Sequence, residues 1–171
     1  MASYNENLGS MDGDTNGVTR EYAVANGVTV TVGDLVYLSA GFITNASIDG
    51  KRLFGQVVGV QTNDLVTPGF RNTATGNAGG TVKVLVDVHD DNRYLMVSDE
   101  VGTNLTSTDV GKFFDVTGAT GAQKIDVSTR STTLGQMLCL RVNPGIRGTG
   151  ATYGIFIPAE LQKQTEDIGA S

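Results

Sequence analysis

A run of aspartate, asparagine and glycine near the start of the chain carries the ligand types of a calcium-binding loop. In "MDGDTNGVTREYA" (residues 11–23), Asp12, Asp14 and Asn16 stand at alternate positions, where side-chain oxygens bind Ca²⁺ in such loops. The loop also requires a glutamate at its twelfth position, and counting from Asp12 that position is Ala23. The flanks lack the apolar stripe of a helix as well. An Asp- and Gly-rich loop without metal is therefore the favoured interpretation, with metal binding by the three oxygens left open.

The other residues with reactive side chains are the single histidine and the single cysteine. His89 precedes two aspartates in "HDDN". Neighbours on a strand point to opposite faces, so an Asp-rich turn explains this group better than a metal site or a general base. Cys139 alternates with apolar residues in "QMLCLRV", which predicts a core side chain and not an exposed, activated thiol. Nucleophile-elbow, phosphate-loop and dinucleotide motifs do not occur. We expect no catalytic residue and no cofactor, with a small β hydrolase as a minor alternative.

The composition favours strands and tight turns. The chain has 171 residues, enough for one domain or two small ones. It combines 23 glycines and many Thr and Val residues with only 3 prolines and no tryptophan. A net charge of −6 argues against binding to nucleic acid, and no apolar run is long enough to cross a membrane. The start "MASYNENLGS" has no signal-peptide pattern, and one cysteine cannot form an internal disulfide. We therefore expect assembly in a cytoplasm.

Alternating apolar residues predict a series of short strands. The strongest is "TVKVLVDVHD", where valines at alternate positions of residues 82–88 share one face, and "RYLMV" (93–97) is expected as its return strand in a hairpin. A glycine turn at "GD" separates residues 28–32 from the next strand. Residues 62–80 lack periodicity and are expected to form a long contact loop, whereas "NLTSTDVG" (104–111) is long enough for one helical turn. Further strands are expected at residues 52–61, 112–116, 123–127, 134–142 and 153–157.

These patterns predict an all-β fold, either an antiparallel sandwich or barrel or two small β subdomains, with an irregular N-terminal arm. The arm would comprise residues 1–22, the first β subdomain residues 23–103, the second β portion residues 104–158 and a C-terminal tail residues 159–171. The two portions share a rhythm of strand, glycine turn and strand, but no repeat of fixed period is evident. Either portion alone would be marginally stable, so we expect each to pack against the other or against another subunit.

Arginines in predicted loops are the candidate partner-binding residues. Only 18% of the residues are charged, so isolated cations stand out in an acidic chain. The planar guanidinium binds carboxylates through two hydrogen bonds and is common at the centre of protein interfaces. Arg71, Arg141 and Arg147 are the positions that we expect to contact a partner, while a role in solubility alone is the plainer alternative.

Taken together, the polar start and the segments "VTVGDLVYLSAG" and "GKRLFGQVVGV" resemble the decoration, or cement, proteins on the capsids of tailed bacteriophages. The resemblance extends over residues 24–158. It implies a structural virion protein, assembled in the host cytoplasm, that binds the capsid exterior. Its partner would be the major capsid protein, its oligomeric state a homotrimer, and its task to clamp neighbouring capsid subunits without catalysis or a cofactor. A carbohydrate-binding or adhesion module is the alternative, although only 6% of the residues are aromatic.

Overall fold

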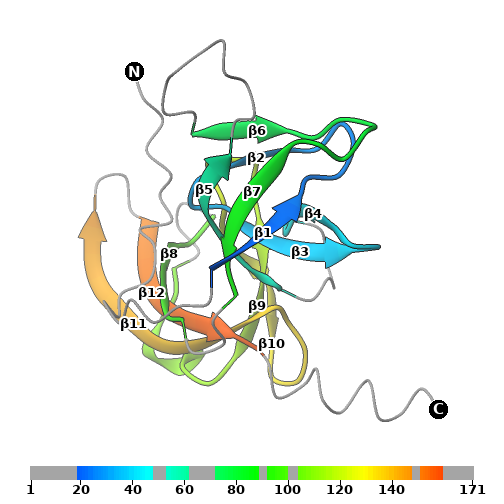
Figure 1. The fold of residues 1–171 in the computed structure, drawn as a ribbon. Helices are drawn as coiled ribbons and strands as arrows, with labels where there is room; N and C mark the ends of the chain where they lie inside the picture. The colour runs from blue at the N-terminus through cyan, green and yellow to red at the C-terminus, as the bar shows by residue number, and fades with distance from the viewer. Residues whose placement is uncertain are drawn as a thin grey trace, which may run out of the picture.

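The protein is built from short antiparallel strands, which confirms the predicted all-β class. The computed structural model describes residues 19–47, 53–61, 72–88, 92–99, 104–147 and 151–159. Within these ranges, twelve strands and a single 3-10 turn form two five-stranded sheets and a two-stranded ribbon. The two larger sheets lie one above the other in Figure 1, and we call them the first and second units.

The first unit is a five-stranded sheet whose two edge strands meet. Its strands follow the order β1-β7-β5-β3-β4. Val24, just after β1, forms a parallel bridge with Ile43 of β4, and the Ala25 N–H donates to the Ile43 carbonyl at 2.9 Å. This contact closes the sheet into a small barrel. The strands are β1 Thr19–Ala23, β3 Leu35–Ser39, β4 Phe42–Asn45, β5 Gly55–Gln61 and β7 Lys83–Asp87, and the ribbon pairs β2 Thr29–Thr31 with β6 Thr73–Thr75.

The second unit closes in the same way. Its strands follow the order β10-β9-β11-β12-β8. Ser98, just after β8, forms a parallel bridge with Ile125 of β10, and the Asp99 N–H donates to the Ile125 carbonyl at 2.9 Å. The strands are β8 Tyr94–Val97, β9 Phe113–Thr117, β10 Lys124–Ser131, β11 Met137–Arg147 and β12 Ala151–Pro158, and the 3-10 turn η1 Ser107–Asp109 precedes β9.

The two units share one topology. When the five barrel strands of each unit are numbered along the chain, both sheets follow the order 1-5-4-2-3, and strands one and three make the closing bridge. The second strand also begins alike in both. The Gly33 N–H donates to the Val57 carbonyl at 2.7 Å, and the Gly111 N–H donates to the Cys139 carbonyl at 2.8 Å. Both glycines have a positive φ, 96° and 83°, which glycine adopts without strain. The chain is therefore a structural tandem repeat of one barrel.

Each unit has an apolar core, and the core of the second unit extends into the first. In the second core, the rings of Phe114 and Phe156 meet edge to face with centroids 5.9 Å apart. Leu35, Ala46 and Leu53 of the first unit are buried in the same cluster, so the two units share apolar burial. The core of the first unit is a separate cluster of Val24, Val30, Val36, Ile43, Val57, Ala74, Val84 and Val86.

Two buried glutamines join the units by hydrogen bonds. Gln123, 1% exposed, accepts the Leu35 N–H at 2.6 Å through Oε1 and donates to the Leu35 carbonyl at 2.9 Å through Nε2. The side-chain amide thus satisfies both backbone groups of Leu35, as a neighbouring strand would. Gln136 links the units a second time, because its Oε1 accepts the Val116 N–H at 2.7 Å while its Nε2 donates to the Ala46 carbonyl at 3.0 Å.

Several expectations from the sequence are confirmed. Val84 and Val86 are fully buried, and Val82 and Val88 pack against the same core. The predicted helical turn is η1. The strands expected in the second half are present as β9, β10, β11 and β12, and β5 lies within the segment expected to follow the first hairpin.

The predicted hairpin between residues 82–88 and 93–97 is wrong. These segments contain β7 and β8, but β8 pairs with β12 in the second unit. The two sheets therefore divide between β7 and β8, ahead of the division that the sequence places between residues 103 and 104. Three of the four residues of β8 are buried, and a strand that is apolar on both faces gives no alternation from which its partner could be chosen.

The predicted arm and the predicted long loop each contain a strand. Residues 19–22 were expected in the arm of residues 1–22 but belong to β1, and residues 73–75 of the expected loop form β6. β1 begins with three exposed residues, and β6 buries only Ala74, so neither strand shows a strong apolar alternation. Residues 1–18 and 62–71 lie outside the described residues.

We expect Gln123→Met to lower the free energy of unfolding by about 1–3 kcal/mol, because it leaves the buried Leu35 N–H without its acceptor while nearly keeping the side-chain volume. The Leu35 carbonyl keeps a second donor, the Ala46 N–H at 3.0 Å. Gln61→Met, at an exposed end of β5, is the matched control and should change stability by less than about 0.5 kcal/mol. Urea unfolding measures both. Equal stability of the two variants would contradict the role assigned to Gln123.

Candidate functional site

Each unit places a buried aspartate in the same kind of turn ahead of its second strand. In "TVGD" the Thr31 N–H donates to Asp34 Oδ2 at 2.8 Å, and in "TSTD" the Thr106 N–H donates to Asp109 Oδ2 at 2.9 Å. Both aspartates are 0% exposed. A buried carboxylate requires donors or cations around it, so the remaining partners of each carboxylate indicate what its turn does.

The Asp34 turn receives a hairpin turn from the second unit. Asp34 Oδ1 accepts the N–H of Gly121, in the turn between β9 and β10, at 2.8 Å. Next to it, Thr120 Oγ1 donates to the Thr29 carbonyl at 2.8 Å and accepts from Asn45 Nδ2 at 3.1 Å. The carboxylate of the first unit is therefore used to fix the second unit in place.

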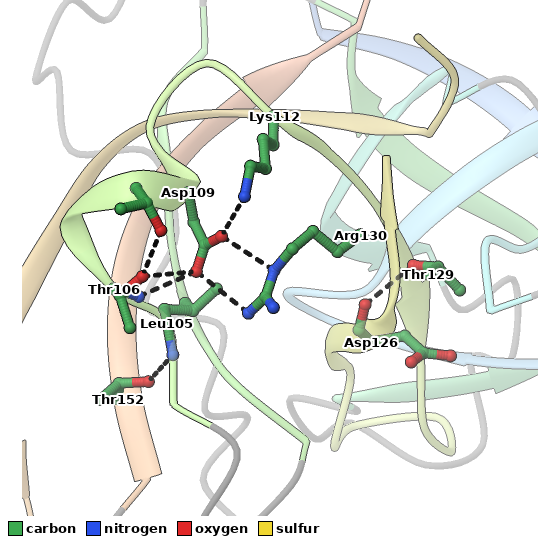
Figure 2. A network of polar contacts seen from close by, with 9 residues as sticks. Leu105, Thr106, Asp109, Lys112, Asp126, Thr129, Arg130 and Thr152 are labelled. Carbon is green, nitrogen blue, oxygen red and sulfur yellow. Dashed lines mark hydrogen bonds and ion pairs between the residues drawn. The ribbon is translucent and has the colours of Figure 1, made fainter. Parts of the chain in front are cut away.

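The Asp109 turn is instead satisfied within its own unit, as Figure 2 shows. Arg130, from β10, approaches the carboxylate with Nε 2.8 Å from Oδ1 and a terminal nitrogen 3.0 Å from Oδ2. Lys112 Nζ lies 3.0 Å from Oδ1, and the Thr106 hydroxyl donates to Oδ2 at 3.3 Å. The two-pronged arginine contact is the strong form of this ion pair.

These partners hold Asp109 in its charged form. Burial alone raises the pKa of a carboxyl group, but the Thr106 N–H together with Lys112 and Arg130 outweighs burial and leaves the pKa of Asp109 below its usual value. The Lys112 and Arg130 side chains remain 27% and 33% exposed. A carboxylate surrounded by donors in this way fixes a turn well and is poorly suited to accepting a proton from a substrate.

A β-bulge presents the predicted partner-binding residue Arg141. Across β11 and β12, Cys139 pairs with Phe156 and Arg141 pairs with Ile155, which leaves Leu140 as the extra residue of the bulge. Leu140 is 37% exposed, and Arg141 is exposed as well. The bulge therefore brings a large apolar side chain and a cation to the surface at adjacent positions.

The other two predicted arginines fall at the limits of the described chain. Arg147 ends β11, where its backbone pairs with Ala151, and its side chain lies outside the described residues. Arg71 lies outside them entirely. Six further candidates from the sequence also lie outside the described residues, namely Asp12, Asp14, Asn16, His89, Asp90 and Asp91.

Cys139 packs in the core of the second unit, as the alternation around it predicts. It is 1% exposed, and burial raises the pKa of its thiol to about 11. A thiol that stays protonated at neutral pH is a weak nucleophile. The structure thus gives Cys139 a packing role.

Large apolar side chains are exposed at positions that sequence patterns do not single out. Leu38 and Phe42 flank the turn between β3 and β4, and Val110 follows Asp109 directly. Phe42 lies next to the fully buried Ile43 in β4, so the sequence alone does not distinguish it from a core residue. The six such residues among those described are Leu38, Phe42, Val58, Val110, Leu134 and Leu140, between 37% and 59% exposed.

Comparison with known proteins identifies no relative, because no protein family, curated protein or solved structure matches the chain. Within the described ranges, no group of three or more His, Cys, Asp or Glu side chains is arranged to hold a metal ion. No helix in the same part of the chain is long and apolar enough to cross a membrane. The function is therefore inferred from the surfaces of the protein itself.

The Asp109 network should make stability depend on pH in acid. The folded-state pKa of Asp109 lies below the unfolded value of about 3.9, so the unfolded chain binds the proton more tightly and acid favours unfolding. The stabilising contribution is complete above the unfolded pKa and is lost as the pH falls through the folded pKa. We expect Asp109→Asn to lower the free energy of unfolding at neutral pH and to reduce its loss below about pH 4, measured by urea unfolding.

Asp126→Asn is the matched control for this experiment. Asp126 Oδ1 accepts the Ser128 N–H at 2.9 Å in an exposed contact within β10, and its replacement leaves the ion pairs of Asp109 intact. The control should keep the acid dependence of the wild type. An equally steep loss of stability in Asp109→Asn would rule out Asp109 as its source.

Proposed function

We propose that this chain is a structural virion protein that binds the outer surface of a bacteriophage capsid as a homotrimer and stabilises the shell by bridging neighbouring capsid subunits. The resemblance over residues 24–158 supports this function, and the all-β build of two closed barrels agrees with it. A protein of this kind works through contact area and needs no reactive group.

The observation that carries the proposal is the bulge in β11. Leu140 and Arg141 stand exposed at adjacent positions of β11. Bulges recur where a strand must re-aim a side chain. An arginine beside an apolar side chain has the chemistry of an interface anchor, since its guanidinium pairs with carboxylates and its stem packs against apolar surface. We assign this bulge to the contact with the major capsid protein.

The charge of the chain suits such an anchor. The net charge is −6, so a second acidic surface is repelled except where a cation is presented. Arg141 offers one charge at a defined place, which favours one orientation of docking over others. A specific interface commonly buries about 1,200–2,000 Å² in total, and repetition around a shell strengthens the attachment of each copy through high effective concentration.

We expect Arg141→Glu to weaken binding to capsid shells at least about tenfold, because it replaces the anchoring cation with a like charge and leaves its acidic partner unpaired. Purified shells that lack the protein are mixed with each variant and sedimented, and the bound fraction is measured against concentration. Arg71→Glu and Arg147→Glu are measured in the same way.

Arg20→Glu provides the matched control, since Arg20 is also exposed but lies on the edge strand β1 of the first unit. It makes the same charge change and should bind shells as the wild type does. Unchanged binding of Arg141→Glu, or a loss that Arg20→Glu shares, would refute the assignment of the capsid contact to the bulge.

A further inference from the structure

Backbone hydrogen bonds allow the two barrels to be compared residue by residue. The Val57 N–H donates to the Asp34 carbonyl in the first unit, and the Cys139 N–H donates to the Lys112 carbonyl in the second, both at 2.9 Å. Val57 and Cys139 therefore hold the same place in β5 and β11. From this pair, the cross-strand register relates the positions of β7 and β1 to those of β12 and β8.

The bulge that exposes Leu140 recurs in the first barrel. Val58 is the extra residue of β5, between the paired residues Val57 and Gly59, and it is 44% exposed against 37% for Leu140. Arg141 thus corresponds to Gly59. The bulge itself is a feature of the barrel, so the residues around it must distinguish the two units.

The strand β12 is apolar on both faces. Gly154 and Phe156 are buried, and Phe156 belongs to the core of the second unit. Tyr153, Ile155 and Ile157 alternate with them and are half-buried, so they point to the outside of the barrel. The outside of this strand therefore carries three large and mainly apolar side chains.

The neighbouring strands continue this surface. Leu138 of β11 pairs with both Ile157 and Phe113, and Leu95 of β8 pairs with Ile155. Residues directly opposite one another share a face of the sheet, and these neighbours are half-buried as well. We call the resulting surface across β9, β11, β12 and β8 the apolar face, and it comprises Leu95, Phe113, Leu138, Tyr153, Ile155 and Ile157.

The equivalent face of the first barrel is mainly polar. Its six positions are Glu21, Leu35, Gln56, Lys83, Leu85 and Asp87. Leu35 is buried in the core of the second unit, so the junction between the units accounts for that apolar residue. The barrel therefore folds with polar residues at most of these positions, and its topology does not require an apolar outer face.

The apolar face remains in contact with water. All six of its residues are half-buried, so each keeps part of its surface accessible. The strands in closest contact with β12 are β11 and β8, its neighbours in the sheet. Contiguous apolar surface of this kind on a soluble protein marks a contact with another molecule.

Arg141 indicates the chemistry of that molecule. It is exposed and pairs with Ile155 across β11 and β12, so it stands at the apolar face, whereas the whole chain has a net charge of −6. A protein surface that combines apolar side chains with a carboxylate complements both features. Nucleic acid would require a series of cations, and the six residues of the apolar face supply none.

We propose that the chain docks on the major capsid protein through the apolar face of its second barrel, with Arg141 paired to a carboxylate, and not through the equivalent face of its first barrel. The inference rests on the proposed function for the identity of the partner and adds which barrel makes the contact. Burial of the apolar face favours binding, and the charge of Arg141 fixes its orientation.

We expect Ile155→Thr and Leu95→Thr each to weaken shell binding at least about tenfold, because each removes apolar contact from the centre of the interface while threonine keeps a high strand propensity. Leu85→Thr is the matched control, since Leu85 holds the place of Ile155 in the first barrel and is also half-buried. It should bind shells as the wild type does. Sedimentation with purified shells measures all three, and equal binding by Ile155→Thr and Leu85→Thr overturns the inference.

A labelling experiment tests the contact without relying on lost affinity. Ile155→Cys and Leu85→Cys are treated with a maleimide, free and bound to shells. Cys139 is buried and the pKa of its thiol is about 11, so it stays protonated and reacts slowly. On shells, the introduced thiol of Ile155→Cys should react at least about tenfold more slowly than in the free chain, and that of Leu85→Cys at an unchanged rate.

The same experiment separates the two proposals. If the wild type sediments with shells but the two introduced thiols are protected equally, or neither is protected, the apolar face is not the contact and the capsid function stands. If the wild type does not sediment with shells, the capsid function fails and the inference fails with it.

Discussion

The structure depends on satisfying the backbone of Leu35 where two small barrels meet. Its side chain is buried in the core of the second unit, although its strand belongs to the first. A backbone drawn into such a position loses water, and an unpaired N–H or C=O there costs about 1–3 kcal/mol. The amide of Gln123 pairs with both groups. Because one side chain supplies the donor and the acceptor, the relative position of the two units is set by geometry as well as by apolar burial.

This junction explains why the same barrel differs in its two copies. In the first unit, the aspartate turn keeps an oxygen for Gly121. In the second unit, Lys112 stands where Asp34 stands in the first, because the Cys139 N–H donates to the Lys112 carbonyl as the Val57 N–H donates to the Asp34 carbonyl. Lys112 and Arg130 pair with Asp109 of η1 within the same unit. The first unit also carries the ribbon of β2 and β6, which the second lacks among its described strands. The two units therefore share a topology but differ in their contacts. The first unit accepts the contact from Gly121, and the second unit supplies that contact and pairs its own Asp109 internally.

Strand positions followed from the sequence where one face of a strand is buried and the other is not. The valines around Val84 are the clearest example, because alternate burial is what periodicity measures. The partner of β8 could not be predicted, since a strand buried on most of its positions carries no directional pattern. The repeat escaped detection for a related reason: the ribbon in the first unit and η1 in the second give the units different spacings, so no constant period survives.

The candidate site was less accessible from the sequence than the fold. Arg141 could be selected as a scarce cation, but its exposure comes from a bulge that shifts the register between Cys139 and Arg141. A one-residue bulge has no characteristic residue pattern, so the sequence does not reveal it. The Asp109 network unites residues 21 positions apart that match no motif. Such networks form only after the strands have taken their places, so they are properties of the barrel and not of a local segment.

The parallel bridges that close the barrels have a mechanical consequence. Each closure rests on a single bridged residue pair, Val24 with Ile43 and Ser98 with Ile125. The other strand pairs within each sheet are antiparallel, and each has more than one paired residue. Tension applied across a barrel would therefore part it at this seam first, since fewest bonds share the load there. A protein bound across one of these bridges would hold the two strands together and raise the force at which the barrel opens.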